Sequence, residues 1–154
     1  MLKEAVETAY LHYHRALDNF NELKELTLDQ QVFDNKEIIK TIDAFIFRFI
    51  KLQDFMGDKL FKTFLNRIGE YKDTMSLLDV MDKLEKLEII TDADRWMEFR
   101  QLRNKLTHEY PDNQEDVISG IKLALEQFKE IGIILDNINR YSQLPRIKER
   151  SKTM

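Results

Sequence analysis

Cysteine is absent from this chain of 154 residues, and proline and glycine are scarce, with two and four copies. The lack of cysteine excludes disulfide frameworks, thiolate zinc sites and thiol nucleophiles, and it fits a reducing compartment. With 43% hydrophobic and 34% charged residues, the composition favours long amphipathic helices over short strands joined by tight turns. The length is that of one domain. We therefore expect a single all-helical domain in the cytoplasm.

Long apolar runs and a strong charge bias are also missing. No window approaches the roughly 20 apolar residues that a membrane span needs, and the segment Met1 to Glu7 has no continuous apolar core. Neither export nor membrane insertion is therefore expected. The 24 basic and 28 acidic residues give a formal net charge of −4, so any contact with nucleic acid has to come from a local basic patch.

Apolar residues recur at helical spacing in several segments. They predict helices over about residues 2–26, from a cap at Asp34 to near Gly69, and over about 77–88, 92–108 and 115–140. The capping-box signature supports three of these starts, through the pairs Asp34 with Glu37, Ser76 with Asp79, and Thr91 with Asp94. Within the long second helix, Gly57 is expected to mark a bend or a close approach of another helix.

The second helix has an unusually wide apolar surface. One seam consists of Ile38, Ile42, Phe45, Phe49, Leu52, Met56 and Leu60, and beside it lie Ile39, Ile46, Phe47, Ile50 and Phe61. Such a belt implies contact on more than one side, and we expect both a central place in a bundle and a face shared with a second subunit. Residues 1–140 are expected to form the bundle, and residues 141–154 a mobile basic tail.

Three histidines are candidates for chemistry. His12 and His14 are two residues apart in a helix, so they point about 200° apart and cannot jointly hold a metal ion; we expect them to be surface or seam residues. His108 differs, because it closes a helix whose carbonyl end favours positive charge. Arg103 and Asn104 lie about one turn earlier.

These residues at the helix end offer complementary chemistry. Asn104 and His108 share a face, and Arg103 and Tyr110 are about 20° apart if the helix persists, although Pro111 biases it to end near His108. An imidazole passes a proton near neutral pH, a guanidinium holds a phosphate, and an amide orients either group. The set suits phosphodiester chemistry without a metal or cofactor. A helix cap with a surface cluster is the other interpretation, and spacing alone favours it.

The segment Arg103-Asn104-Lys105-Leu106-Thr107-His108-Glu109-Tyr110 resembles the signature of the HEPN superfamily. That signature is an arginine, usually followed by a polar residue, with a histidine a few places later. In the HepT branch it continues to a tyrosine two residues past the histidine, which corresponds to Tyr110. The flanking residues 42–54 and 84–96 also resemble HepT-like and nucleotidyltransferase-substrate-binding relatives, so the resemblance covers most of residues 34–140.

The resemblance implies an antiparallel bundle of four to five helices that forms a homodimer, with the motifs of two subunits lining one cleft. HepT-like proteins are toxins of toxin–antitoxin pairs, and they cleave RNA without a metal. Their partner is a small nucleotidyltransferase of the MNT type. Arg103 would then hold and polarise the phosphate, His108 would act as general acid or base in the attack of the ribose 2′-hydroxyl, and Asn104 would orient them.

Further residues take roles from the same resemblance. Tyr110 would receive AMP from the nucleotidyltransferase, and the added anion would block the cleft beside Arg103. RNA would be drawn to Arg103, Arg100 and Lys105, together with the basic tail. Asp54 or Arg48 would support the site from the second helix; an interhelical ion pair or a solvent contact is the alternative for each.

Two other functions remain open from the sequence. The chain can be a binding module without catalysis that presents a nucleotide or substrate to a separate nucleotidyltransferase. It can also be a helical interaction domain in which the motif is a relic.

Overall fold

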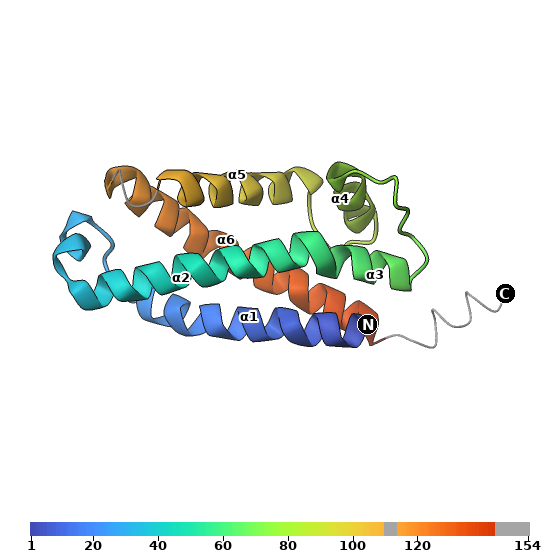
Figure 1. Ribbon diagram of the computed structural model, residues 1–154, viewed down its shortest axis with the longest axis horizontal. Coiled ribbons are helices and arrows are strands. Elements are labelled where there is room, and N and C mark those ends of the chain that lie inside the picture. Colours follow the sequence, from blue (N-terminus) through green and yellow to red (C-terminus); the bar gives the residue numbers. More distant parts are fainter. Residues whose placement is uncertain (110–113, 144–154) are drawn as a thin grey trace.

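The computed structural model describes residues 1–109 and 114–143, which fold into a bundle of helices (Figure 1). The helices are α1 (Leu2–Leu23), α2 (Lys36–Phe55), α3 (Phe61–Arg67), α4 (Leu77–Lys86), α5 (Ala93–Glu109) and α6 (Gln114–Ser142). A 3-10 turn, η1 (Gln30–Asp34), precedes α2, and a π-helical turn, η2 (Met56–Leu60), joins α2 to α3. Along these described residues no strand occurs, so the predicted all-helical class is confirmed.

The four long helices α1, α2, α5 and α6 run alternately in opposite directions, as Figure 1 shows. This confirms the antiparallel bundle. Helix α4 packs on α5, and its Lys83 forms an ion pair of 3.1 Å with Glu70, which follows α3 in the chain. None of the helices in the described segments combines the length and apolar character needed to cross a membrane.

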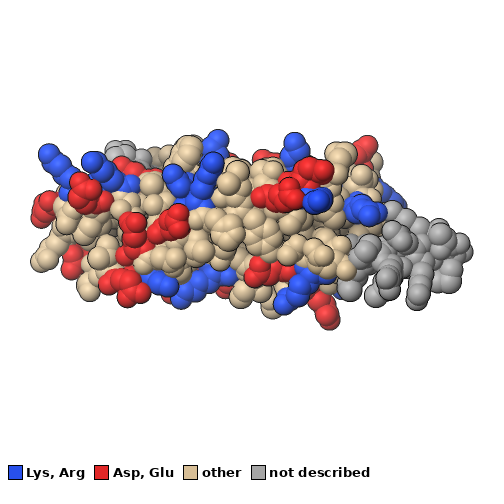
Figure 2. Space-filling model, turned by 90° about the horizontal axis from the view of Figure 1, so that it is seen from below, with Lys and Arg blue, Asp and Glu red and all other residues tan. Residues whose placement is uncertain are grey.

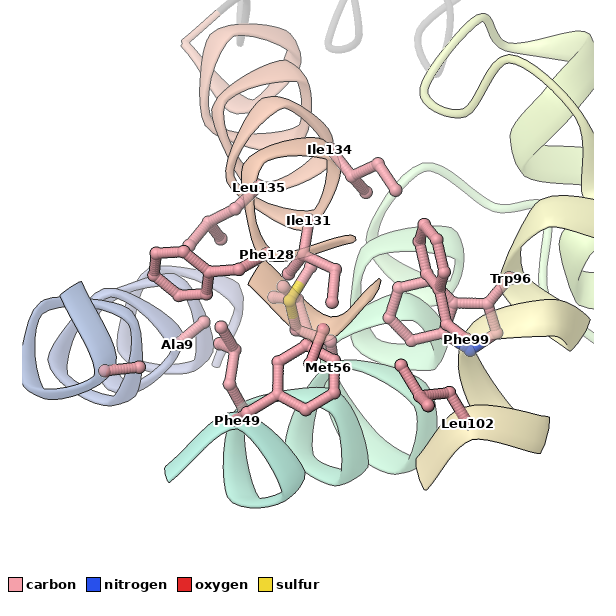
Figure 3. Close-up of a cluster of buried hydrophobic side chains, with 14 of the residues drawn as sticks. Ala9, Phe49, Met56, Trp96, Phe99, Leu102, Phe128, Ile131, Ile134 and Leu135 are labelled. Atoms are coloured by element: carbon pink, nitrogen blue, oxygen red, sulfur yellow. The ribbon is translucent and has the colours of Figure 1, made fainter. Parts of the chain in front are cut away.

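Helix α2 and its continuation η2 occupy the centre of the bundle, where they pack against α1, α5 and α6. In Figure 3, Phe49 and Met56 lie between the α6 side chains Phe128 and Ile131 and the α5 side chain Phe99. The expected seam is buried at Ile42, Phe45, Phe49, Leu52, Met56 and Leu60. The central place is therefore confirmed. One member of the apolar belt is not covered within the chain, because Phe47 remains 61% exposed.

The cap of α2 differs from the prediction by one residue. Asn35, and not Asp34, accepts hydrogen bonds from the backbone N–H groups of Glu37 and Ile38, at 3.0 and 3.2 Å. Asp34 is the last residue of the turn η1, and Asn35 is the first residue with the extended angles of a cap, φ −114° and ψ 107°. The composite helix ends as expected at Gly69, whose φ of 77° lies in the left-handed region.

The other two predicted caps have opposite outcomes. The Ser76–Asp79 capping box at the start of α4 is confirmed in both of its bonds. The Thr91 cap is wrong, because Asp92 accepts from the backbone N–H of Asp94 at 2.9 Å. Helix α6 continues to Ser142, past the expected end at Arg140. Most of the predicted tail, residues 144–154, lies outside the described residues.

Candidate functional site

Residues 103–109 of the motif lie on the last two turns of α5. Trp96, Phe99, Leu102 and Leu106 are buried against the core, so the helix is fixed in rotation about its axis. Arg103 is consequently half-buried at the edge of the core, whereas Asn104 and His108 are exposed. Packing thus turns Arg103 toward the surface between α5 and α2.

Arg103 forms a paired salt bridge with Asp54 of α2. Its Nε donates to Asp54 Oδ1 at 3.0 Å and its Nη2 to Oδ2 at 2.8 Å. This hydrogen bonding raises the pKa of Arg103, with partial burial opposing the rise. Nη1 makes a longer bond of 3.4 Å to Asn104 Oδ1. Since a guanidinium has five N–H donors, one on Nη1 and one on Nη2 stay available in this part of the chain.

A pocket of about 320 Å³ opens beside this salt bridge. Helix α2 and η2 form one wall with Gln53, Asp54, Gly57 and Asp58, and α5 forms the opposite wall with Trp96, Arg100, Arg103 and Asn104; Lys62 of α3 also lines it. Gln53 fixes the two walls together, because its Nε2 donates to the backbone carbonyl of Phe99 at 3.1 Å.

Cations outnumber carboxylates around the pocket. Arg103 is neutralised by Asp54, but neither Arg100 nor Lys62 forms an ion pair with any residue that the structure describes. Asp58 is the second carboxylate of the lining. The pocket therefore has a local positive excess, although the whole chain is acidic. Elsewhere the charges are mixed: on the face that carries α1, Figure 2 shows acidic and basic side chains interspersed.

His108 stands outside the pocket lining. It follows Arg103 by five residues, which in a helix means about 140° of rotation and roughly 9 Å between Cα atoms. Asn104 lies between them in rotation, about 40° from His108. The structure thus brings Arg103, Asn104 and Asp54 together, with His108 on the adjoining exposed face. Tyr110 lies outside the described residues.

The two weaker supporting residues lie elsewhere. Arg48 ties α2 to α1, since its Nη1 donates to the carbonyl of Arg15 at 3.3 Å. Lys105 is exposed and lines a different hollow, between α5 and α6. Neither residue lines the pocket beside Arg103.

The other two histidines occupy aromatic surroundings on α1. His12 packs against Phe55 with 5.6 Å between ring centroids, and its burial lowers its pKa. His14 stacks on Tyr10 at 6.0 Å. In residues 1–109 and 114–143, no three His, Asp or Glu side chains converge as metal ligands would.

Sequence reasoning did not assign Gly57, Asp58, Lys62 or Trp96 to a site. Gly57 was notable as a glycine inside a helix, and Trp96 as the only tryptophan of the chain. Their proximity depends on how α5 packs on η2. A Cβ built on Gly57 would lie 3.5 Å from Trp96 Nε1, so the Trp96 side chain of α5 packs on η2 at this glycine.

Comparisons with protein families, with curated proteins and with solved structures found no match for this chain.

Proposed function

We propose that this chain is a HepT-like toxin of a toxin–antitoxin pair and that it cleaves RNA without a metal ion. The observation that supports this most is the Arg103–Asp54 salt bridge, with N–O distances of 3.0 and 2.8 Å. It orients a guanidinium at the edge of a polar pocket and leaves N–H donors for a second anion. An arginine held in this way suits recognition of a phosphodiester.

In the proposed reaction, the ribose 2′-oxygen forms a bond to phosphorus while the bond from phosphorus to the 5′-oxygen breaks. Arg103 contacts the non-bridging oxygens, whose negative charge grows in the transition state. His108 transfers a proton, taking it from the 2′-hydroxyl or giving it to the leaving 5′-oxygen. Asn104, which is next to Arg103 and on the face of His108, orients the two groups.

A second copy of the chain is part of the proposal. Phe47 is the only exposed Phe, Tyr or Trp side chain among the described residues. It precedes Asp54 by seven residues, so both lie within about 20° on one face of α2. An exposed phenylalanine on the face that carries the site favours burial against a partner. A homodimer that uses this face would bring two motifs, each with an exposed His108, into one cleft.

The test is RNA cleavage by the purified protein in the presence of a chelator. Wild-type protein should cut RNA, whereas Arg103→Ala and His108→Ala should be at least about 100-fold slower, the range for loss of acid–base or oxyanion contacts. His14→Ala is the matched control, because it removes another exposed histidine, on α1. Intact RNA with wild-type protein, or equal cutting by His108→Ala, contradicts the proposal.

The proposed antitoxin is a nucleotidyltransferase of the MNT type that adds AMP to Tyr110. Incubation with that enzyme and ATP should raise the mass by one adenylyl unit or more, and Tyr110→Phe should abolish the increase. Modification confined to other residues would remove this role of Tyr110.

One observation favours a second function. His108 does not line the pocket that Arg103 lines, so the pocket can bind a phosphate without a proton-transfer group. The chain would then be a non-catalytic nucleotide- or substrate-binding subunit of a nucleotidyltransferase. In that case calorimetry should detect nucleotide binding, RNA should remain intact, and expression of the chain alone should be harmless.

A further inference from the structure

Trp96 has a buried side chain whose indole N–H is left without an acceptor in the described chain and lies at a pocket. The residue is 1% exposed, yet its indole N–H donates to no acceptor among the residues that the structure describes. Buried tryptophan N–H groups usually find a hydrogen-bond partner, because a lone buried donor is costly. The Trp96 N–H is not among the fully buried side-chain atoms without a partner, so it reaches the pocket, where solvent or a ligand can accept from it.

Gly57 makes this donor accessible from the pocket. Both Gly57 and Trp96 line it, and Nε1 lies 3.5 Å from where a Cβ on Gly57 would be. With no side chain at this position, the edge of the indole faces the pocket past the backbone of η2. Turns of π-helix inside an α-helix are frequent at functional sites, and η2 here forms part of a pocket wall.

Two cations line the same pocket as the Trp96 N–H and favour an acceptor that carries negative charge. Arg100 of α5 and Lys62 of α3 line the same pocket, are exposed, and have no ion pair in the described part of the chain. Asp58, the carboxylate of the lining that is not paired with Arg103, is itself exposed. An oxygen acceptor that carries negative charge, as in a phosphate group, suits a pocket lined by an N–H donor and two cations.

We propose that Trp96, Arg100 and Lys62 form a second phosphate subsite, entered past Gly57. Arg100 and Arg103 are three residues apart on one helix, so their Cβ atoms are about 5–6 Å apart. That spacing is comparable to the distance between successive phosphates on an RNA strand. The subsite thus holds the phosphate next to the one that Arg103 contacts. The assignment of this phosphate to RNA rests on the proposed function, whereas phosphate binding itself does not.

The experiment measures binding separately from cleavage. Because Trp96 is the only tryptophan, its fluorescence reports occupancy directly during titration with a trinucleotide whose 2′-hydroxyls are replaced by hydrogen. Such a strand cannot undergo the proposed attack. Titration with AMP and with inorganic phosphate in parallel distinguishes a nucleic-acid strand from a free phosphate source.

Gly57→Ala is the decisive variant. Its methyl group meets Trp96 at ordinary van der Waals distance, 3.5 Å, and alanine is favoured over glycine in a helix, so the protein should unfold at an equal or higher temperature. The methyl group covers Nε1 and should weaken trinucleotide binding by about tenfold, the loss of one hydrogen bond to a charged group.

Arg100→Ala should weaken trinucleotide binding, and the salt dependence of that binding should fall by about one counterion. Lys122→Ala, an exposed lysine on α6, is the control and should bind like wild type.

The results separate the two proposals. If RNA remains uncut but Gly57→Ala and Arg100→Ala still bind the trinucleotide more weakly, the subsite stands and the ribonuclease proposal fails. If both variants bind all three ligands like wild type, or wild type binds none of them, the subsite proposal is overturned. Tighter binding of AMP than of the trinucleotide identifies the occupant as a free nucleotide, and the reverse order identifies an RNA strand.

Discussion

Two nearly identical salt bridges on α5 allow a test of what the Arg103–Asp54 pair does. Arg103 contacts Asp54 at 3.0 and 2.8 Å, and Arg95 contacts Glu130 of α6 at 3.0 and 2.7 Å. The exposed fractions are also similar, 29% and 39% in the first pair and 38% and 42% in the second. Asp54→Ala and Glu130→Ala therefore remove the same kind of bond, and only the first bond lies at the candidate site.

The expected cost to stability is small and similar in the two variants. Unit charges 4 Å apart attract each other by about 4 kcal/mol at an effective dielectric constant of 20, but desolvation and side-chain ordering offset most of this. Exposed ion pairs contribute about 0.2–1 kcal/mol to the free energy of unfolding. The two parallel hydrogen bonds in each of these pairs place both near the upper end of that range. Each variant should lose about 1 kcal/mol of unfolding free energy, or about 2–4 °C in Tm.

The two variants should differ in RNA cleavage although they are similar in stability. Urea denaturation gives the stability of each variant, and RNA cleavage in the presence of a chelator gives its activity. Asp54→Ala should lower activity by about tenfold or more, because Arg103 is no longer fixed in the orientation that contacts phosphate. Glu130→Ala should keep wild-type activity. Equal activities in the two variants would refute the reasoning that Asp54 positions Arg103.

Three further predictions concern the bundle and its assembly. Burial and the 2.6 Å hydrogen bond from Tyr10 to Asp136 raise the pKa of Tyr10. Its contribution to stability should therefore be complete below about pH 10 and be lost as pH rises further, and urea unfolding from pH 8 to 11 should show a weaker decline in Tyr10→Phe. A Cβ on Gly132 would lie 2.9 Å from the Tyr13 ring, so calorimetry should find Gly132→Ala less stable by about 1 kcal/mol, the overpacking cost less the gain in helix propensity. Phe47→Glu should leave the fold intact, because the side chain is 61% exposed, but should convert a dimer to a monomer in analytical ultracentrifugation; an unchanged dimer contradicts its place in the interface.

The course of the helices could be predicted because apolar spacing determines which face is buried. The seam of α2 from Ile42 to Leu60 is buried as expected. Helix ends were less predictable where two capping residues are adjacent. Asp34 and Asn35 are both good caps by type, and the turn η1, which includes Asp34, decides between them.

The candidate site was predictable along one helix but not between helices. Spacing places Arg103, Asn104 and His108 near one another, and Asp54 was expected to support them. The sequence does not show that His108 stays outside the pocket of Arg103, nor that Trp96 reaches Gly57, because both depend on the rotation of α5 against α2 and η2. That Trp96 lines the pocket beside Arg103 is visible only once packing is known.

The chemistry of the product ends tests the central claim most directly. RNA should be incubated with wild-type protein and a chelator, and the fragments analysed by mass spectrometry, with His108→Ala in parallel. Attack by the 2′-oxygen predicts fragments that end in a 2′,3′-cyclic phosphate and begin with a 5′-hydroxyl, formed by wild type and not by His108→Ala. Fragments with 5′-phosphate and 3′-hydroxyl ends, or the same fragments from His108→Ala, would contradict the account.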